Sequence, residues 1–196
     1  MHYEETIKPI KSSDQPLVSI ITPLFNAEKF IHETIRTVLD QTYTNWEHIV
    51  VDDASSDASV IVAKRSFNGD SRFKLIQLEN NCGAAYCRNY ATEQALGKYI
   101  AFLDSDDMWH PQKLEQQIQI MEKESLSVTF TSYLHIDEHG NPLNKRIKAL
   151  PSLSYTKQHR NNYIGNLTGV YSAGTLGKIF APNIRKRQDW AVWLEA

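Results

Sequence analysis

The sequence predicts an α/β fold in which a mostly parallel central sheet is flanked by helices on both faces. In the first half of the chain, short and almost continuously apolar runs alternate four times with amphipathic segments. Such strands are typical of a parallel sheet, because the connecting helices cover both of its faces. The length of 196 residues suits one domain and is sufficient to bury a large core without disulfide or metal support.

Each predicted strand is a run of β-branched or aromatic residues, and each predicted helix has apolar residues spaced three and four apart. The expected strands cover 18–21, 49–51, 75–78 and 99–103, and the expected helices cover 30–39, 60–67, 83–96 and 114–121. Pro23 should end the first strand, while Asn26 and Asp57 should cap the first two helices. Gly83 should open the third helix, and Gly97 should close it as a C-terminal glycine.

The second half is less regular. Residues 128–136 are predicted as a fifth strand, and the turn signal at 139–142 indicates a hairpin. A polar helix over 155–162 and a strand over 167–171 should follow. Residues 188–196 begin an amphipathic helix that has no stop signal. We therefore expect either that the natural protein continues or that the chain is cut at this point.

Composition argues against several classes of protein. Lys and Arg number 21 against 23 Asp and Glu, so a global basic field for nucleic acid is excluded, although a local patch is not. No run approaches the roughly 20 apolar residues of a membrane span, and the N-terminal segment lacks the apolar core of a signal peptide. Two cysteines are too few for a disulfide scaffold. A reducing cytoplasm fits best, and the composition still permits peripheral membrane contact.

Polar residues follow the predicted strands where a ligand would bind. In open α/β sheets, ligands bind beyond the carboxyl ends of the strands. That rule selects residues 23–26, 52–57, 79–83 and 104–107. Three of these four segments carry the polar or acidic side chains that a binding site uses.

The acidic run 104–107 is the most informative of these segments. If the chain stays extended after the strand, Asp104 and Asp106 face one space and Asp107 faces away. Two carboxylates in one space favour a hard divalent ion, Mg²⁺ or Mn²⁺, whose remaining ligands are waters and substrate phosphates. The alternative is an acidic loop that caps the helix beginning near Pro111.

The pair Asp52 and Asp53 offers a different kind of recognition. One of them can cap the next helix, which leaves the other to accept a hydrogen bond from the ring N–H of uracil, thymine or guanine. Phe25 could stack on a base, although core packing is the more common role of a lone phenylalanine. Asn26 could serve both the helix and a ligand.

Arg88 and Asp189 each have a functional and a structural interpretation. Arg88, less than two turns into the third helix, could reach a diphosphate or pair with a nearby carboxylate. Asp189 could be a catalytic base or a helix cap, and the spacing does not decide. Preceding it is a basic cluster, which could contact phosphate or form a solvated face; its members are Lys178, Arg185, Lys186 and Arg187. The cysteines match no metal or redox spacing, and the glycosylation pattern at 166–168 is given no weight.

Taken in order, these segments resemble the inverting glycosyltransferases of family 2, which have the GT-A fold. The resemblance rests on 18–26, 50–57, 81–83 with 88–89, and 99–107, and it runs from about residue 17 to about residue 126. Within the family, residues 184–190 are most similar to bacterial enzymes of cell-surface polysaccharide synthesis, such as the teichuronic acid type.

The resemblance implies a role for each matching residue. The residues expected to bind the nucleotide sugar are Pro23, Phe25, Asn26, Asp53, Arg88, Asp104 and Ser105. Asp53 would accept from the base, and Asp104 and Asp106 would hold Mn²⁺ or Mg²⁺, with Asp106 the direct ligand. Asp189 would be the general base, next to Gln188 where many members have Glu.

The implied function is transfer of a sugar from a nucleotide diphosphate sugar, with UDP favoured, to a hydroxyl of a glycan or lipid-linked acceptor. Transfer would invert the anomeric carbon by metal-assisted single displacement. We expect a flexible lead at 1–16, a nucleotide-sugar-binding half at 17–126 and an acceptor-side half at 127–196 that is truncated at its C-terminus. The expected location is the cytoplasm, at the inner face of the plasma membrane. The alternatives are a non-catalytic nucleotide-sugar-binding module and a sugar nucleotidyltransferase.

Overall fold

The computed structural model describes residues 14–182, 184 and 187–196. Most of the expected lead, up to residue 13, therefore lies outside the described residues, as do Arg185 and Lys186 of the basic cluster. The main sheet has six strands in the order β3-β2-β1-β4-β8-β5. Its strands are β1 (Val18–Leu24), β2 (Trp46–Asp52), β3 (Phe73–Gln77), β4 (Tyr99–Phe102), β5 (Val128–Thr129) and β8 (Val170–Ser172).

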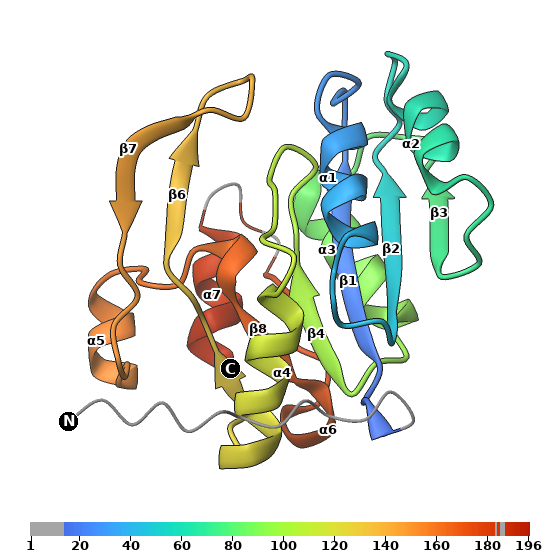
Figure 1. Ribbon diagram of the computed structural model, residues 1–196. Helices are drawn as coiled ribbons and strands as arrows, with labels where there is room; N and C mark the ends of the chain where they lie inside the picture. The colour runs from blue at the N-terminus through green and yellow to red at the C-terminus, as the bar shows by residue number, and fades with distance from the viewer. Residues whose placement is uncertain (1–13, 183, 185–186) are drawn as a thin grey trace.

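The predicted α/β class is confirmed, because the four strands of the first half are all parallel. Strand β1 lies between β2 and β4, and β3 adds to the far side of β2. The later strand β8 runs antiparallel to both β4 and β5. All four parallel strands therefore end at one edge of the sheet, which is the upper edge in Figure 1.

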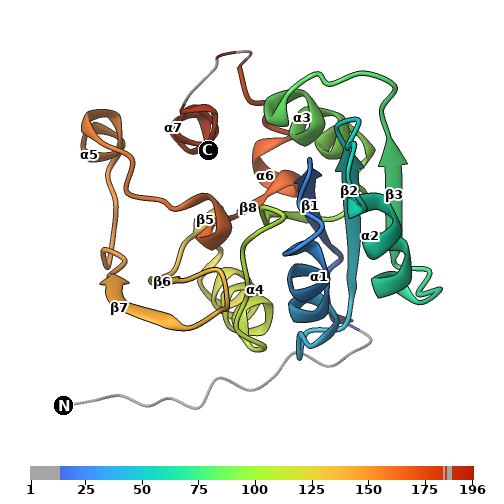
Figure 2. The same cartoon turned by 90° about the horizontal axis from the view of Figure 1, so that it is seen from above.

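Helices cover both faces of this sheet, as Figure 2 shows from above. One face carries α1 (Ile31–Leu39), α2 (Ser59–Phe67) and α4 (Lys113–Glu124), and the other carries α3 (Ala84–Gln94), α6 (Ala173–Leu176) and α7 (Gln188–Glu195). Consecutive strand residues serve opposite faces. Ile20 accordingly belongs to the same apolar cluster as Leu114 of α4, whereas Ile21 belongs to the same cluster as Trp193 of α7.

Pro23 does not end the first strand; β1 continues through it to Leu24. The carbonyl of Ile21 accepts from Leu103 beyond β4, and the carbonyl of Leu24 accepts from Asp53 beyond β2. Backbone groups of successive residues face opposite neighbouring strands, so the nitrogen of Pro23 faces β4, as the carbonyl of Ile21 does. The pairing of β1 with β4 stops at Ile21. A missing N–H costs no ladder hydrogen bond at that position.

The predicted helix boundaries need three corrections. Phe30, not Asn26, is the N-cap of α1, while Ala58 is the N-cap of α2 and Asp57 accepts from the amide of Ser59 at 2.9 Å. Helix α3 begins after Gly83 as expected but ends at Gln94. Gly97 is required by crowding rather than by capping, since a Cβ there would lie 2.6 Å from the backbone nitrogen of Ser19.

The strand expected over 128–136 is two strands in two different sheets. Strand β5 belongs to the main sheet, whereas β6 (Tyr133–Ile136) pairs antiparallel with β7 (Pro142–Ile147). The expected turn joins β6 and β7, and this hairpin stands apart from the main sheet in Figure 1. The predicted polar helix is α5 (Tyr155–Arg160), and the 3₁₀ helix η2 (Asn166–Thr168) precedes β8. No helix among the described residues is long and apolar enough to cross a membrane.

Candidate active site

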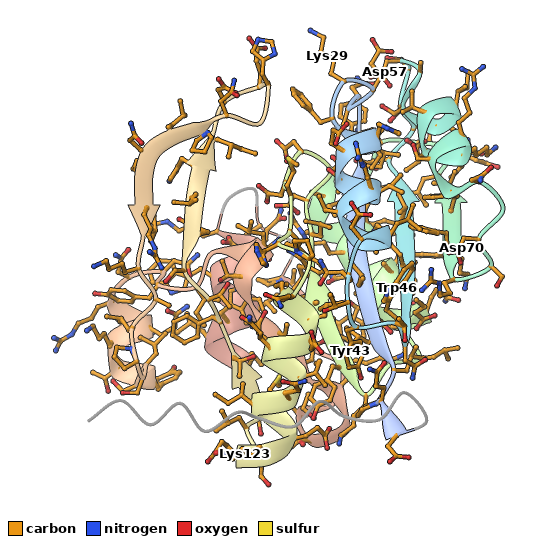
Figure 3. All side chains as sticks on the ribbon, viewed as in Figure 1. Lys29, Tyr43, Trp46, Asp57, Asp70 and Lys123 are labelled. Atoms are coloured by element: carbon orange, nitrogen blue, oxygen red, sulfur yellow. The ribbon has the colours of Figure 1, made fainter. Side chains whose placement is uncertain are left out.

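The loops after β1 and β2 are tied to each other at the carboxyl edge of the sheet. Asn26 has a left-handed backbone, with φ of 46°, and its side-chain oxygen accepts from the amide of Ser56 at 2.9 Å. Its own amide donates to the Ser55 hydroxyl at 3.0 Å. In Figure 3, Lys29 and Asp57 mark this edge of the molecule, and Asp57 accepts there from the amide of Glu28. Asn26 thus shapes the loop that presents Phe25.

Phe25 is exposed, which removes core packing as the explanation for it. Its side chain is 48% exposed, although the adjacent Leu24 is completely buried. Pro23 is half-buried at the end of the same strand. An exposed aromatic ring at the carboxyl edge of a parallel sheet is available to stack on a planar ligand. Pro23, Phe25 and Asn26 therefore lie together where the sequence predicted a nucleotide pocket.

Asp53 organises the loop that precedes α3. Its two carboxylate oxygens accept from the backbone amides of Cys82 and Gly83, at 2.6 and 2.9 Å. The side chain of Asn81 donates to the carbonyl of Asp53 at 3.2 Å. Only 3% of Asp53 is exposed. A carboxylate has about four lone-pair positions, so these contacts leave acceptor capacity for a base. Sequence reasoning missed this structural role.

Asp52, the other member of the pair, turns toward its own loop. One of its oxygens accepts from the amide of Ser55 at 3.3 Å, and the other is buried without a hydrogen-bond partner among the described residues. The first helix residue of α2, Ser59, binds Asp57 and not Asp52. Asp52 therefore shapes the turn after β2 and does not cap the helix.

Arg88 is paired with Asp104, across a gap of 16 residues in the sequence. The Nη2 atom of Arg88 lies 2.6 Å from a carboxylate oxygen of Asp104, and only 13% of the arginine side chain is exposed. Nη1 donates to Gln188 of α7 at 3.3 Å, while Nε is buried without a partner among the described residues. The guanidinium thus connects α3, the loop after β4 and α7, with donor capacity remaining.

Asn166 is a second partner of Asp104, and sequence reasoning gave it no weight. Its amide nitrogen lies 3.2 and 3.4 Å from the two oxygens of that carboxylate. In the sequence, Asn166 is an asparagine beside a predicted strand, 62 residues from Asp104, and nothing else links the two positions. No periodicity relates such positions, and the contact exists because β8 pairs with β4 and brings η2 to its end.

The chain turns after β4, so the extended geometry expected for residues 104–107 is wrong. The amide of Asp107 donates to the carbonyl of Asp104 at 3.1 Å, and the Thr34 hydroxyl lies 2.9 Å from the carbonyl oxygens of both Ser105 and Asp107. Burial, and then the nearby carboxylates of Asp104 and Asp106, raise the pKa of Asp107 to about 7. The turn therefore concentrates negative charge in a small volume.

The donor chemistry of this turn fits a hard divalent cation. Asp106 is exposed and makes no hydrogen bond to the described residues, so its carboxylate oxygens are available as ligands. No group of three acidic, histidine or cysteine side chains converges on a metal position in the described part of the chain. Mg²⁺ typically binds one or two carboxylates, with phosphates and waters as its other ligands. Asp106, with Asp104 beside it, matches that pattern.

Asp189 lies in the first turn of α7, but it is not the N-cap. Arg187 occupies the cap position, and the carboxylate of Asp189 accepts from the side chain of Asn162 at 2.8 Å. Arg88, Asn166 and Asp189 all line one crevice that is too narrow to admit a water molecule, which we call the Arg88 crevice. The structure therefore brings the predicted base next to the partners of Asp104, although 85 residues separate Asp189 from Asp104 in the sequence.

The described part of the basic cluster makes local contacts. The Lys178 ammonium donates to the carbonyl of Glu93 at 2.7 Å, at the end of α3. The Arg187 guanidinium lies 5.1 Å from the centre of the Trp190 ring. Lysine at a helix C-terminus and arginine over an indole are common stabilising contacts. The interpretation of the cluster as a phosphate contact remains a prediction.

A mostly parallel sheet with acidic and amide side chains along its carboxyl edge is the arrangement of GT-A glycosyltransferases, the class that the sequence resembles. Residues 19–181 match the family model described as Glycosyl transferase family 2. The chain therefore belongs to glycosyl transferase family 2. Both the resemblance and the fold that it implies are confirmed.

Similar proteins include two bacterial relatives. The chain is 45% identical over 180 residues to TuaG of Bacillus subtilis (strain 168), whose name assigns it to teichuronic acid biosynthesis. It is 41% identical over 181 residues to WfgD of Escherichia coli, named a UDP-Glc:alpha-D-GlcNAc-diphosphoundecaprenol beta-1,3-glucosyltransferase. The matches cover 92% of this chain, with 71% of TuaG and 70% of WfgD. Polysaccharide synthesis in bacteria is thus the setting of its named relatives.

Two solved structures share the fold. TarS of S. aureus, residues 1–349 in complex with UDP-GlcNAc, superposes with a TM-score of 0.76 at 24% identity over 91% of this chain. The mannosyltransferase PcManGT of Pyrobaculum calidifontis, in complex with GDP-Man and Mn²⁺, gives a TM-score of 0.69 at 17% identity over 95% of this chain. This chain spans 52% and 53% of those solved chains, about half of each.

Proposed function

We propose that this protein transfers a sugar from a nucleotide diphosphate sugar, with UDP-sugars favoured, to a hydroxyl group of a saccharide acceptor, with inversion at the anomeric carbon. The observation that carries the proposal is that Arg88 and Asn166, the two partners of Asp104 in the acidic turn, line one crevice together with Asp189. The name of WfgD, its relative from Escherichia coli, supports both a UDP-sugar donor and a lipid-linked acceptor. Such an acceptor would bring the protein to the inner face of the plasma membrane by peripheral contact.

The first half of the chain, residues 17–126, would bind the donor. Phe25 is exposed for stacking on the base, and Asp53 retains acceptor capacity for a ring N–H. Arg88 would bind a diphosphate oxygen with the donors that its present contacts leave over. Asp104 and Ser105 would contact the sugar side of the nucleotide at the end of β4.

Asp106, with Asp104, would hold Mn²⁺ or Mg²⁺ at the acidic turn. A divalent ion bound there would stabilise the negative charge that develops on the departing diphosphate. The chain itself keeps this region ordered, because Thr34 binds the carbonyls of Ser105 and Asp107. The position of Asp106 is therefore set by backbone contacts that do not depend on its own carboxylate.

Asp189, from the acceptor-side half at 127–196, would act as the general base. Its carboxylate takes the proton of the acceptor hydroxyl while that oxygen forms the new bond to the anomeric carbon. The bond from this carbon to the diphosphate breaks at the opposite side, and the diphosphate leaves with the electron pair. Because attack and departure occur on opposite faces, one displacement inverts the configuration. The hydrogen bond from Asn162 would orient the carboxylate during the transfer.

The metal role of Asp106 can be tested by titrating UDP into the chain with and without Mn²⁺ in a calorimeter. We expect the parent to bind UDP only when Mn²⁺ is present, and Asp106→Ala to lose this Mn²⁺-dependent binding because the metal ligand is gone. Asp106 is exposed, so the variant should keep the parental melting temperature. Glu79→Ala, another exposed carboxylate at this edge, is the control. Equal UDP–Mn²⁺ affinity in parent and Asp106→Ala would refute the metal assignment.

The products released from a UDP-sugar distinguish the proposed reaction from its alternatives. A glycosyltransferase releases UDP from a UDP-sugar when an acceptor saccharide is present. A non-catalytic module would bind the nucleotide sugar without releasing UDP under any condition. A sugar nucleotidyltransferase would instead form a nucleotide sugar from a nucleoside triphosphate and a sugar 1-phosphate.

A further inference from the structure

A second concave surface lies on the other side of the acidic turn. It is a cleft of about 710 Å³, which we call the Lys113 cleft, and its walls include Asp107, Trp109, Lys113, Tyr133, Arg146 and Leu167. The segment after β4 forms one wall and the β6–β7 hairpin forms another. Asp107 belongs to the acidic turn, and Leu167 follows Asn166 of the Arg88 crevice. The cleft is therefore a neighbour of the proposed donor site.

Lys113, the first residue of α4, is a buried cation without a counter-charge. Only 8% of the residue is exposed, and its Nζ atom has no hydrogen-bond partner among the described residues. Nζ lies 4.0 Å from the centre of the Trp109 ring, within the range of a cation–π contact. Burial lowers the pKa of Lys113 to about 7. A buried amine is costly unless it is paired, so its presence in a cleft wall requires an explanation.

A second cation faces the same cleft from the hairpin. Arg146 of β7 is exposed and forms no ion pair with the described residues. His110 also lines the cleft, and Asp107 is the acidic residue in its wall. Two basic side chains, Lys113 and Arg146, thus face the space against one acidic side chain, which favours an anionic ligand.

The remaining lining suits a sugar. Tyr133 and Trp109 supply aromatic surface, and the Trp109 ring is fixed by its hydrogen bond to the carbonyl of Leu167 at 2.8 Å. Gln116 and Thr131 add polar side chains. Saccharides combine apolar ring faces with hydroxyl groups, and pockets that bind small polar molecules combine aromatic walls with a few polar groups. A volume of about 710 Å³ is within the range of such sites.

We propose that the Lys113 cleft binds the acceptor saccharide through an anionic group, a carboxylate or a phosphate, held by Lys113 and Arg146. The inference rests on the proposed transfer reaction, because it takes the ligand of this cleft to be the acceptor. The lysine amine lies over the indole, and a rotamer change of its flexible side chain would present it to the anion. The β6–β7 hairpin thereby becomes part of acceptor recognition.

The test is calorimetric titration of the 196-residue chain with four probes: methyl glucuronide, glucose 1-phosphate, uncharged methyl glucoside and inorganic phosphate. We expect at least one charged saccharide to bind about 30-fold more tightly than methyl glucoside, because a desolvated charge pair contributes about 2 kcal/mol or more. Whether the glucuronide or the sugar phosphate binds tells which anion the cleft takes. Equal affinity for charged and uncharged saccharides would overturn the proposal, as would inorganic phosphate binding as tightly as glucose 1-phosphate.

Three variants locate the effect. Lys113→Met should remove the roughly 30-fold preference for the charged saccharide, while the exposed Arg146→Met should reduce it two- to fivefold, about the strength of a solvated ion pair. Lys145→Met is the matched control: it removes a charge from the adjacent β7 residue, which does not line the cleft. A preference that survives in Lys113→Met would overturn the proposal.

Titration with UDP and Mn²⁺ keeps this result separate from the proposed function. All three variants should bind UDP–Mn²⁺ like the parent, which also shows that they are folded. If the parent fails to bind UDP–Mn²⁺ but keeps the Lys113-dependent affinity for a charged saccharide, the proposed function fails and the cleft stands as a site for an anionic saccharide. If UDP–Mn²⁺ binds and the preference for a charged saccharide is absent, the cleft assignment fails and the proposed function stands.

Discussion

At the scale of single residues, the carboxylates of this molecule differ in role because they differ in partners. Asp53 accepts from two backbone amides, Asp104 accepts from Arg88 and Asn166, and Asp106 accepts from none of the described residues. A carboxylate that already accepts several hydrogen bonds is held in place, whereas an exposed one can exchange water for a metal ion. The sequence presents all three as aspartates after strands, and only their partners separate a positioning carboxylate from a ligand.

Asp189 provides the sharpest residue-scale prediction. Asp189→Asn keeps a side-chain oxygen that can accept from Asn162, so the fold and nucleotide affinity should stay parental. The amide cannot take a proton, so the transfer rate should fall by about 10²–10⁴, the usual contribution of a general base. Transfer is measured as acceptor-dependent UDP release. A rate within a few-fold of the parent would show that Asp189 only binds Asn162.

At the scale of elements, the site depends on how closely α7 approaches the segment between η2 and β8. Gly169 lies in that segment, and a Cβ there would come within 2.3 Å of the Trp193 ring of α7. Its φ of −79° is open to any residue, so packing alone demands glycine. This contact holds the element that carries Asp189 against the one that carries Asn166.

We therefore expect Gly169→Ala to destabilise the protein by about 1–3 kcal/mol, the usual cost of overpacking. It should also slow transfer, because Trp193 and the helix must move away from η2. Gly174→Ala is the control, since a Cβ there would lie 3.4 Å from the nearest side-chain atom, which is ordinary contact. Urea denaturation measures stability, and the UDP-release assay measures transfer. Parental values for both in Gly169→Ala would contradict this account.

At the scale of the whole molecule, stability should depend on pH through Lys113. Its pKa is about 7 in the folded chain, against 10.5 when exposed, so above pH 7 the unfolded chain binds the additional proton. Stability should accordingly rise with pH above 7, by up to about 1.4 kcal/mol per pH unit. Asp107, whose pKa is raised to about 7, has the opposite effect up to about pH 8. Burial raises the pKa of Cys87 to about 12, which has the opposite effect above about pH 9, so the useful window is about pH 8 to 9.

Lys113→Met should be more stable than the parent at pH 7 and should lose this rise, because no amine is then buried. Urea unfolding at several pH values, with Lys145→Met as the control for removal of an exposed lysine, measures both effects. The same slope in the parent and in Lys113→Met would mean that another group causes it.

The sequence by itself determined the layered fold and the edge at which the candidate site lies. Alternation of apolar strands with amphipathic helices is local information, and a parallel sheet necessarily brings the ends of its strands to one edge. Phe25, Asp53 and Asp104 could therefore be assigned to a common site before any contact was known. The motifs in those loops sufficed for the family, which the family match confirms.

Only the tertiary structure decided which of these residues touch. Arg88 meets Asp104 across 16 residues and Asn166 meets Asp104 across 62, distances at which periodicity carries no information. The strand expected over 128–136 divides between two sheets because its second part pairs with the β7 strand and forms one wall of the Lys113 cleft. The burial of Lys113 has the same origin: a lysine at the start of a helix is expected to be exposed, and only the tertiary structure buries it, with its amine over the Trp109 ring.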